Sequence, residues 1–253
     1  MSMPETPRRY GAITLFPEMF DSLTRWGITG RAHDQGLWGL SLTNPREFAD
    51  DRHGTVDDRP YGGGPGMVMQ PAVMDRALEA SRQQVGGSAK VIALTPQGRV
   101  FSDGLARELV SETSLIFVAG RYEGIDERFL EASVDVELSV GDFVVSGGEL
   151  PAMVVMDALI RLLPGALGHG DSAEEDSFAN GVLDWPHYTR PETYRGVDVP
   201  AVLLSGDHGA IARWRRAQAL RRTLDRRPDM LSWQALSDED RMLLNEWKLD
   251  EKQ

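Results

Sequence analysis

The chain of 253 residues contains no cysteine. This absence excludes disulfide bonds, cysteine-ligated zinc and a thiol nucleophile, and it is typical of proteins of the reducing cytosol. The sequence also lacks any stretch close to the roughly 18 apolar residues that a membrane-spanning helix needs. Residues 1–10 are polar and lack the apolar core of a secretory signal. We therefore expect a cytoplasmic protein with no membrane contact.

Lysine is nearly absent, and the usual phosphate-binding signatures are missing with it. The three lysines, Lys90, Lys248 and Lys252, do not follow glycine, which excludes the Gly-Lys-Ser/Thr sequence of a P-loop. The glycines of residues 62–66 crowd around a proline and follow no strand, so they are not the Gly-x-Gly-x-x-Gly fingerprint of dinucleotide binding. The five histidines lack the i, i+4 spacing of a zinc-protease helix, and we expect no metal site.

Charge is unevenly distributed along the chain. A formal net charge of -12 argues against a protein that coats nucleic acid by bulk attraction. Arginine is nevertheless concentrated in residues 213–227, where only Asp225 opposes it. On a helix, Arg215, Arg222 and Arg226 would share one face suited to a phosphate backbone. A solvated basic face is the alternative, but such a concentration in an acidic chain favours nucleic acid.

Short apolar segments alternate with helical patterns in the first part of the chain, which predicts an α/β fold around a largely parallel sheet. We expect strands at residues 10–16, 37–43, 89–94, 115–119 and 134–138. We expect helices at residues 17–26, 71–84, 102–111, 148–163 and 208–226. A last helix is expected from Ser237, which forms a capping box with Asp240.

The domain boundary is predicted from composition. Residues 168–181 (GHGDSAEEDSFANG) are small, polar and acidic without periodicity, which is typical of a flexible linker. We therefore expect a first domain of residues 1–167, a linker of residues 168–181 and a small helical domain of residues 182–253. Taken alone, Glu174, Glu175 and Asp176 in the linker are ordinary solvated charges.

Three glycine-bearing loops follow three of the expected strands, at residues 95–98, 120–124 and 139–149. In open α/β sheets ligands bind at the carboxyl ends of strands, where glycine lets the main chain approach a ligand closely. Each glycine alone could simply make a tight turn. The three loops together favour a pocket for a nucleotide-like cofactor within residues 90–151. The glycine-rich segment 57–67 is either a loop over this site or a plain surface loop.

Two further segments carry unusual side chains. The helix expected from residue 149 is apolar on almost every side, which indicates a core or subunit-interface helix. Its exceptions, Asp157 and Arg161, either form an internal ion pair or leave the arginine to meet an anionic substrate. Residues 184–191 (DWPHYTRP) mix aromatic and charged side chains, suited to stacking on and reading bases or to forming a compact turn.

Taken in order, these motifs closely resemble the bacterial tRNA (guanine-N1)-methyltransferase family of the SPOUT class. The resemblance spans nearly the whole chain. It is carried by residues 14–17 (TLFP), 61–67 (YGGGPGM), 95–98 (TPQG), 120–124 (GRYEG), 139–148 (SVGDFVVSGG), 176–178 (DSF) and 186–191 (PHYTRP). The chain departs from the family at Thr95, Asn180 and Trp185, where serine, aspartate and cysteine are common, and none of these changes removes a polar group that the chemistry needs.

The resemblance implies a trefoil-knotted first domain and a homodimer whose active sites are shared between subunits. It implies that S-adenosylmethionine binds in the knot, with its adenine contacted by main chain. The cofactor-binding residues would be Thr95, Pro96, Gln97, Gly98, Gly120, Arg121, Tyr122, Glu123, Gly124, Ser139, Val140, Gly141, Asp142, Gly147, Gly148 and Pro151. Family members also use magnesium, which these residues alone do not identify.

The resemblance further implies methylation of N1 of the guanine at position 37 of tRNA, 3′ of the anticodon. Asp176, supplied by the partner subunit, would remove the N1 proton, and Arg161 would stabilise the charge that develops on O6. Asp184, His187, Arg215 and Arg222 would contact tRNA.

Two alternatives remain open, namely a SPOUT methyltransferase acting on a tRNA ribose 2′-OH and a non-catalytic tRNA-binding protein. Without cysteine, the covalent route to a pyrimidine C5 is excluded.

Overall fold

The computed structural model describes residues 6–168, 176–232, 234 and 236–250. The chain divides into two compact units, residues 1–170 and 171–253. Residues 169–175 of the expected linker, with Glu174 and Glu175, lie outside the described residues. Residues 176–181 form hydrogen-bonded turns of the second unit, in which the Phe178 amide donates to the Val182 carbonyl.

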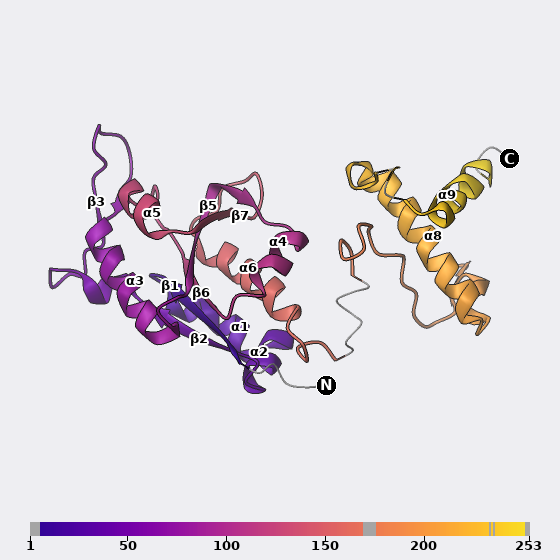
Figure 1. The fold of residues 1–253 in the computed structure, drawn as a ribbon, viewed down its shortest axis with the longest axis horizontal. Helices are drawn as coiled ribbons and strands as arrows, with labels where there is room; N and C mark the ends of the chain where they lie inside the picture. The colour runs from indigo at the N-terminus through magenta and orange to yellow at the C-terminus, as the bar shows by residue number, and fades with distance from the viewer. Residues whose placement is uncertain (1–5, 169–175, 233, 235, 251–253) are drawn as a thin grey trace. The chain divides into compact units, whose positions relative to one another are not determined.

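The first unit is built on a five-stranded sheet (Figure 1). Its strands are β1 (Arg8–Ile13), β2 (Trp38–Thr43), β5 (Lys90–Val100), β6 (Ser114–Val118) and β7 (Val136–Ser139), in the order β2-β1-β6-β5-β7. All neighbouring pairs are parallel, which confirms the expected α/β fold with a largely parallel sheet. A separate antiparallel pair joins β3 (Asp57–Asp58) to β4 (Val68–Met69).

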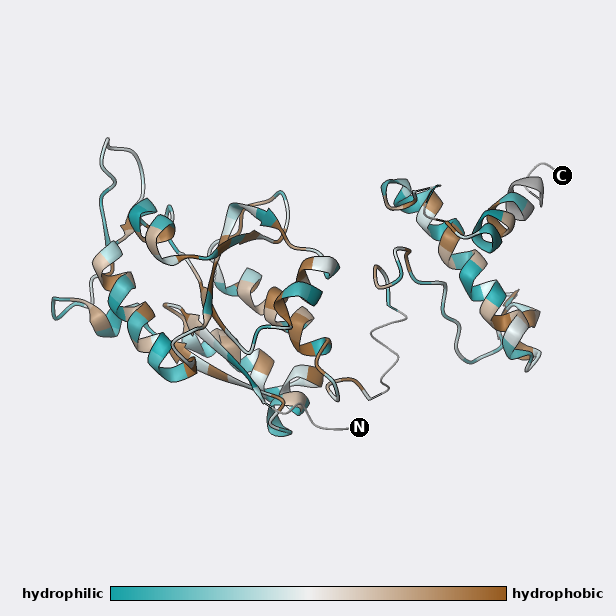
Figure 2. Cartoon of the chain, in the orientation of Figure 1, coloured by the Kyte–Doolittle hydropathy of each residue, from teal (hydrophilic) through white to brown (hydrophobic). Residues whose placement is uncertain are grey.

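Helices cover both faces of the sheet. Among the described residues, the helices of this unit are η1 (Pro17–Phe20), α1 (Asp21–Arg25), α2 (Gly27–Asp34), η2 (Pro45–Phe48), α3 (Pro71–Val85), α4 (Asp103–Leu109), α5 (Glu127–Ser133) and α6 (Glu149–Arg161). Alternate residues of the central strand β6 point to opposite faces. Leu115 and Phe117 pack with α1, α2, α4 and α6, whereas Ile116 and Val118 pack with α3 and α5. Figure 2 shows α6 mostly in the brown of apolar residues.

The expected helix at residues 17–26 is divided in the structure. The 3-10 turn η1 is followed by the short helix α1, whose C-cap is Trp26, and α2 begins at Gly27, which has a positive φ. The helices α2 and α5 were not predicted, because each is short and depends on contacts beyond its own sequence. The Trp38 indole donates to the Thr29 carbonyl of α2, and the Asp126 side chain caps α5.

Strand β5 is longer than expected and contains an irregularity. Its pairing with β7 shifts register, since Leu138 is opposite both Leu94 and Arg99. The intervening residues 95–98 leave the pairing, so the expected loop lies inside the strand as a bulge. A Cβ on Gly98 would lie 2.5 Å from the main chain of Glu137 and Leu138, so glycine is required where the bulge meets β7.

The second unit is held by two helices. It contains β8 (Thr193–Tyr194), β9 (Val197–Asp198), η3 (Ala201–Leu204), α8 (His208–Arg226), η4 (Pro228–Met230) and α9 (Asp238–Asp250). An apolar cluster forms between α8 and α9 from Val182, Ala219, Leu220, Leu243 and Leu244. As expected, the Ser237 hydroxyl caps α9 by accepting the Asp240 amide at 3.0 Å. None of the described helices is long and apolar enough to cross a membrane.

A two-pronged ion pair adds a polar contact between α8 and α9. The Arg216 guanidinium donates to the two carboxylate oxygens of Asp240 at 2.7 and 2.8 Å. This hydrogen bonding lowers the pKa of Asp240 below its ordinary value. The Asp240 side chain is 10% exposed and that of Arg216 is 35% exposed, so solvent weakens the pair only in part.

We predict that Asp240→Asn destabilises the second unit by about 1 to 2 kcal/mol at pH 7. Because the folded pKa is lowered, the carboxylate's contribution is complete above the unfolded pKa of about 3.9 and is lost as pH falls through the folded pKa. Calorimetric melting curves should therefore converge for wild type and variant as the pH falls below about 4. The control is Asp229→Asn, which breaks the exposed pair with Arg227 and should change little. Equal shifts for both variants would contradict the prediction.

Candidate active site

The three glycine loops meet at one edge of the sheet, because they follow the neighbouring strands β6, β5 and β7. They enclose a cavity of about 460 Å³, within the size range of small-molecule sites. All expected cofactor residues except Gly98 and Asp142 line it, namely Thr95, Pro96, Gln97, Gly120, Arg121, Tyr122, Glu123, Gly124, Ser139, Val140, Gly141, Gly147, Gly148 and Pro151. The structure thus brings together three sequence segments in one cavity.

Gly98 and Asp142 do not line the cavity in the part of the chain that the structure describes. Gly98 faces the main chain of β7, and Asp142 is exposed on the turn after it. The cavity is also lined by side chains that are not among the expected cofactor-binding residues. They include apolar side chains (Leu94, Ile125, Leu130, Leu138, Phe143, Val144, Val145) and carboxylates (Glu127, Glu137). The apolar run at residues 143–145 between glycines was the available signal for part of this set.

The loops owe their shape to local backbone constraints. Gly124 and Gly141 have φ values of 135° and 147°, a region that side chains rarely allow. The Ser139 hydroxyl lies 3.0 Å from the Gly141 carbonyl and 3.2 Å from its amide, which fixes the turn after β7. Tyr122 also has a positive φ, of 61°. Desolvation, together with a hydrogen bond to Asp57, raises the pKa of the Tyr122 phenol.

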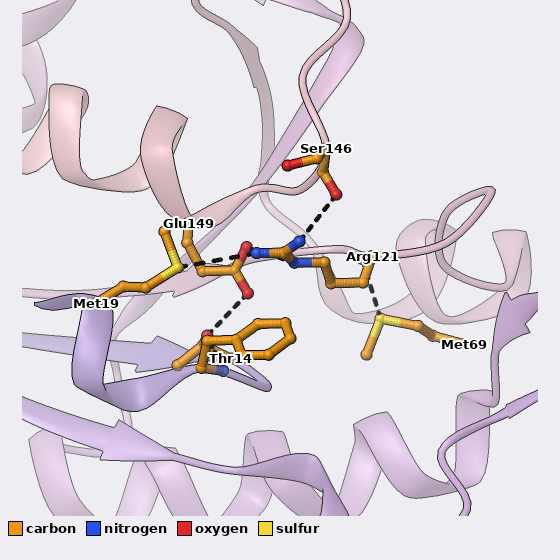
Figure 3. A network of polar contacts seen from close by, with 7 residues as sticks. Thr14, Met19, Met69, Arg121, Ser146 and Glu149 are labelled. Atoms are coloured by element: carbon orange, nitrogen blue, oxygen red, sulfur yellow. Dashed lines mark hydrogen bonds and ion pairs between the residues drawn. The ribbon is translucent and has the colours of Figure 1, made fainter.

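A buried polar network lies behind the loops (Figure 3). The Glu149 carboxylate accepts the Thr14 hydroxyl at 3.0 Å and the Arg121 Nε at 2.8 Å. The Arg121 guanidinium also donates to the Ser146 carbonyl at 3.0 Å and stacks 4.4 Å from the Phe16 ring centre. Glu149 is completely buried, and a buried carboxylate requires such partners.

The glycine-rich segment ends beside this cavity without lining it. Residues 59–67 join β3 to β4, and Tyr61 at their outer part is fully exposed. At its base, the Glu123 amide donates to the Met67 carbonyl at 2.9 Å and the Met69 amide to the Gly124 carbonyl at 2.9 Å. The segment is therefore an exposed loop anchored to the cavity loop 120–124.

The expected tRNA-contacting residues gather in the second unit. A cavity of about 250 Å³ there is lined by Asp176, Asp184 and Arg215, among others. His187 Nε2 lies 2.7 Å from the Asp184 carboxylate, and Arg222 donates to the Asp184 carbonyl at 3.4 Å. The segment 184–187 is thus packed against α8.

Aromatic rings join this packing. The Arg215 guanidinium lies 4.9 Å from the Trp185 ring centre, and the rings of Trp185 and His187 are 5.6 Å apart. The Nε of Arg215 is buried without a hydrogen-bond partner among the described residues. Several other arginines of the basic segment are neutralised, since Arg216, Arg221 and Arg227 pair with Asp240, Asp225 and Asp229.

Arg161 ends α6 in the first unit, whereas Asp176 belongs to the second. Both alternatives for Arg161, an ion pair with Asp157 and a contact with an anionic substrate, stay predictions. Among the described residues, no group of three or more histidine and carboxylate side chains lies close enough to hold a metal ion.

Comparison with known proteins gives consistent matches along the chain. The family model for tRNA (Guanine-1)-methyltransferase TrmD matches residues 9–233. The tRNA (guanine-N(1)-)-methyltransferase of Pseudomonas putida (strain W619) is 59% identical over 239 residues, 94% of this chain and 96% of the relative. The enzyme of the same name from Neisseria gonorrhoeae (strain FA 1090) is 57% identical over 234 residues, 92% of this chain and 94% of the relative.

Close main-chain packing at Gly148 gives a prediction about the cavity wall. A Cβ at Gly148 would lie 2.7 Å from the Ala119 Cα and 2.9 Å from the Gly120 amide. We predict that Gly148→Ala destabilises the chain by about 1 to 3 kcal/mol, because main chain must shift to relieve the overlap. The control is Gly39→Ala in β2, which has open space around it. Thermal unfolding measures both variants, and equal melting temperatures would contradict the prediction.

Proposed function

The chain belongs to the tRNA (Guanine-1)-methyltransferase TrmD family, and we propose that the cavity at the ends of β5, β6 and β7 binds its methyl donor. The protein is an enzyme that methylates N1 of guanine in tRNA, with S-adenosylmethionine as the donor. The family resemblance of its motifs is thereby confirmed.

The residues that line the cavity support its assignment as the donor site. Five glycines of the loops line the cavity (Gly120, Gly124, Gly141, Gly147 and Gly148), and at a glycine the main chain can approach a flat adenine ring closely. Glu123, Glu127 and Glu137 also line the cavity. Carboxylates suit a ligand that carries a positive sulfonium, an ammonium group and ribose hydroxyls. The bound donor supplies an electrophilic methyl group.

Asp176 is our candidate for the base that accepts the N1 proton of guanine. Removal of that proton frees the N1 lone pair and moves negative charge onto O6, where Arg161 would stabilise it. An unperturbed aspartate has a pKa of about 3.9 and is a weak base, so stabilisation of the guanine anion must assist the transfer. Alignment of N1 with the methyl group provides much of the remaining acceleration.

The target that we propose is the guanine at position 37 of tRNA, and the second unit provides the contacts. Asp184, His187, Arg215 and Arg222 form one packed group with Asp176. Arginine beside an aromatic ring can contact phosphate or stack on a base. This grouping supports a common role in holding the anticodon region while the base is presented to Asp176.

We further propose that the first unit contains the trefoil knot of the SPOUT class. Strand β7 is at the edge of the sheet, yet the residues after it contact the ends of more central strands. The Gly148 amide donates to the Gly120 carbonyl after β6, and Glu149 accepts Thr14 after β1. The chain therefore returns across β5 towards the centre of the sheet, as a knotted connection requires.

A homodimer with shared active sites is the third part of the proposal. Leu150 and Val154 lie one turn apart on α6 and are 51% and 55% exposed, and Val144 is 82% exposed. Exposed apolar side chains gathered near a site are typical of a subunit interface. A second copy of the chain would cover them and would bring its Asp176 to the cavity.

Two minor parts complete the proposal. A cytoplasmic location follows from the tRNA substrate. The described residues do not form a protein-only metal cage, so any magnesium ion would be held mainly by water and substrate oxygens, as magnesium commonly is.

We predict that Asp176→Asn abolishes most methyl transfer from labelled S-adenosylmethionine to a tRNA transcript while leaving donor affinity within about twofold. The amide keeps the shape of the side chain and loses the base. The control is Asp198→Asn, an exposed carboxylate of the same unit bonded to Thr193. Methyl groups mapped to ribose would support the 2′-OH alternative, and no transfer by wild type would support the non-catalytic one.

Mixing two inactive variants tests whether the site is shared. Gly120→Leu would fill the cavity, and Asp176→Asn removes the base. After random reassociation we expect about a quarter of wild-type activity, because half of the dimers are mixed and each has one intact site. If one subunit supplied both the cavity and Asp176, the mixture would remain inactive. Formation of mixed dimers is checked separately, by native mass spectrometry with one of the two variants carrying a mass tag.

A further inference from the structure

Glu149 has no function in the chemistry described above, although it is a completely buried carboxylate beside the cavity. Its two oxygens are used in different directions, one towards the Thr14 hydroxyl after β1 and one towards Arg121 after β6 (Figure 3). Glu149 is the first residue of α6. One carboxylate thus joins three segments that are distant in the sequence.

Arg121 is held from several sides at once. Its Nε donates to Glu149 at 2.8 Å and its Nη1 to the Ser146 carbonyl at 3.0 Å, while the ring of Phe16 lies under the guanidinium. Its side chain is only 19% exposed. Because these donors are directed into the protein, the guanidinium connects the loop after β6 to residues 146–149.

The two glycines before Glu149 pack closely against Arg121 and the two residues that precede it. A Cβ on Gly147 would overlap the Arg121 side chain, and Gly148 packs on the main chain of Ala119 and Gly120. The Gly148 amide donates to the Gly120 carbonyl at 2.9 Å. Segments 119–121 and 146–149 are therefore interlocked, and both contribute residues to the cavity wall.

We propose that Glu149 is a positioning residue, which acts through Arg121 to hold these two loops at the separation that the methyl donor requires. The proposal rests on the proposed function in one respect, namely that the donor binds in this cavity. A buried carboxylate that is ion paired and hydrogen bonded holds its partner side chains in place, because separation would leave a buried charge unpaired. Loss of the carboxylate frees the Arg121 side chain and lets the loops separate.

The test uses two changes to the network and a measurement of donor binding by calorimetry. Glu149→Gln keeps the size of the side chain and removes its charge. Thr14→Val removes the hydroxyl that donates to Glu149, and its matched control, Thr14→Ser, retains the hydroxyl. We expect Glu149→Gln and Thr14→Val to raise the dissociation constant and KM for S-adenosylmethionine about tenfold or more, as loss of supporting partners does at other sites. Thr14→Ser should remain within about twofold of wild type.

Separate kinetic parameters distinguish positioning from general loss of stability. At saturating donor, kcat and the KM for tRNA should stay within about threefold of wild type, because the reacting groups are unchanged. A second control, Glu112→Gln, breaks a pair with Lys90 at the other end of β6 and should leave donor binding unchanged. If Glu149→Gln does not fold, the donor affinity of Thr14→Val alone tests the proposal. Unchanged donor affinity in folded variants, even with a lower melting temperature, would overturn the proposal.

A double-mutant cycle tests whether Glu149 acts through Arg121. The losses of donor-binding free energy caused by Arg121→Met and Glu149→Gln should be strongly non-additive. The double variant should bind the donor as well as the single variant with the lower affinity does. Additive losses would overturn the proposed route. Gly120→Leu separates the two hypotheses, because it obstructs the cavity directly. If Gly120→Leu binds S-adenosylmethionine with wild-type affinity, the proposed donor site is refuted. If Gly120→Leu loses donor affinity while Glu149→Gln and Thr14→Val keep it, only the positioning role of Glu149 is refuted.

Discussion

The first unit depends on one buried charge pair, that of Glu149 with Arg121. Strand β7 ends at the edge of the sheet, and the chain must return from there to the ends of β6 and β1. A carboxylate buried on this path is tolerated only with both oxygens paired, and loss of one partner from such a pair typically costs about 3 to 5 kcal/mol. The pair, with the Thr14 hydroxyl, therefore attaches the first residue of α6 to the segments that follow β6 and β1. With α6 in place, its apolar face completes the core beneath the sheet.

The second unit follows a different principle, since its apolar cluster is small. Polar contacts attach the segment that precedes α8 to that helix. The Leu183 amide donates to the Thr223 hydroxyl at 2.8 Å, and the Asp184 amide donates to the Ser177 hydroxyl at 3.0 Å. Asp176 is thus attached to the same body as the residues that we propose for tRNA contact. Under our proposal, the base and the groups that contact tRNA therefore belong to one unit and would move together.

The parallel sheet could be predicted from sequence because its central strands are buried on both faces. Continuous apolar runs such as residues 115–119 leave few alternatives. The three glycine loops could also be predicted, because glycine directly after a buried strand is typical of a tight turn or of a loop that approaches a ligand. Gly98 is the exception among the loop glycines that we expected at the cavity, because the position of a Cβ on Gly98 is occupied by the main chain of β7.

The network of Thr14, Arg121 and Glu149 could not be predicted from the residues alone. Its members lie on three segments, and no local pattern records which ones meet. The helices α2 and α5 were missed for a related reason. Short helices of low intrinsic stability form where tertiary contacts support them. The packing of Arg215 and Arg222 against residues 184–185 likewise depends on two segments that only the fold brings together.

The glycines of the cavity wall have a consequence for resistance to inhibitors. A protein usually escapes an inhibitor by exchanging a contacting side chain for another. Around this cavity, exchange is restricted at Gly124 and Gly141 by their positive φ and at Gly148 by contact with neighbouring main chain. A compound that binds these loops closely would therefore meet a surface with few single-step routes to resistance, and those routes would also alter the site that we propose for the methyl donor.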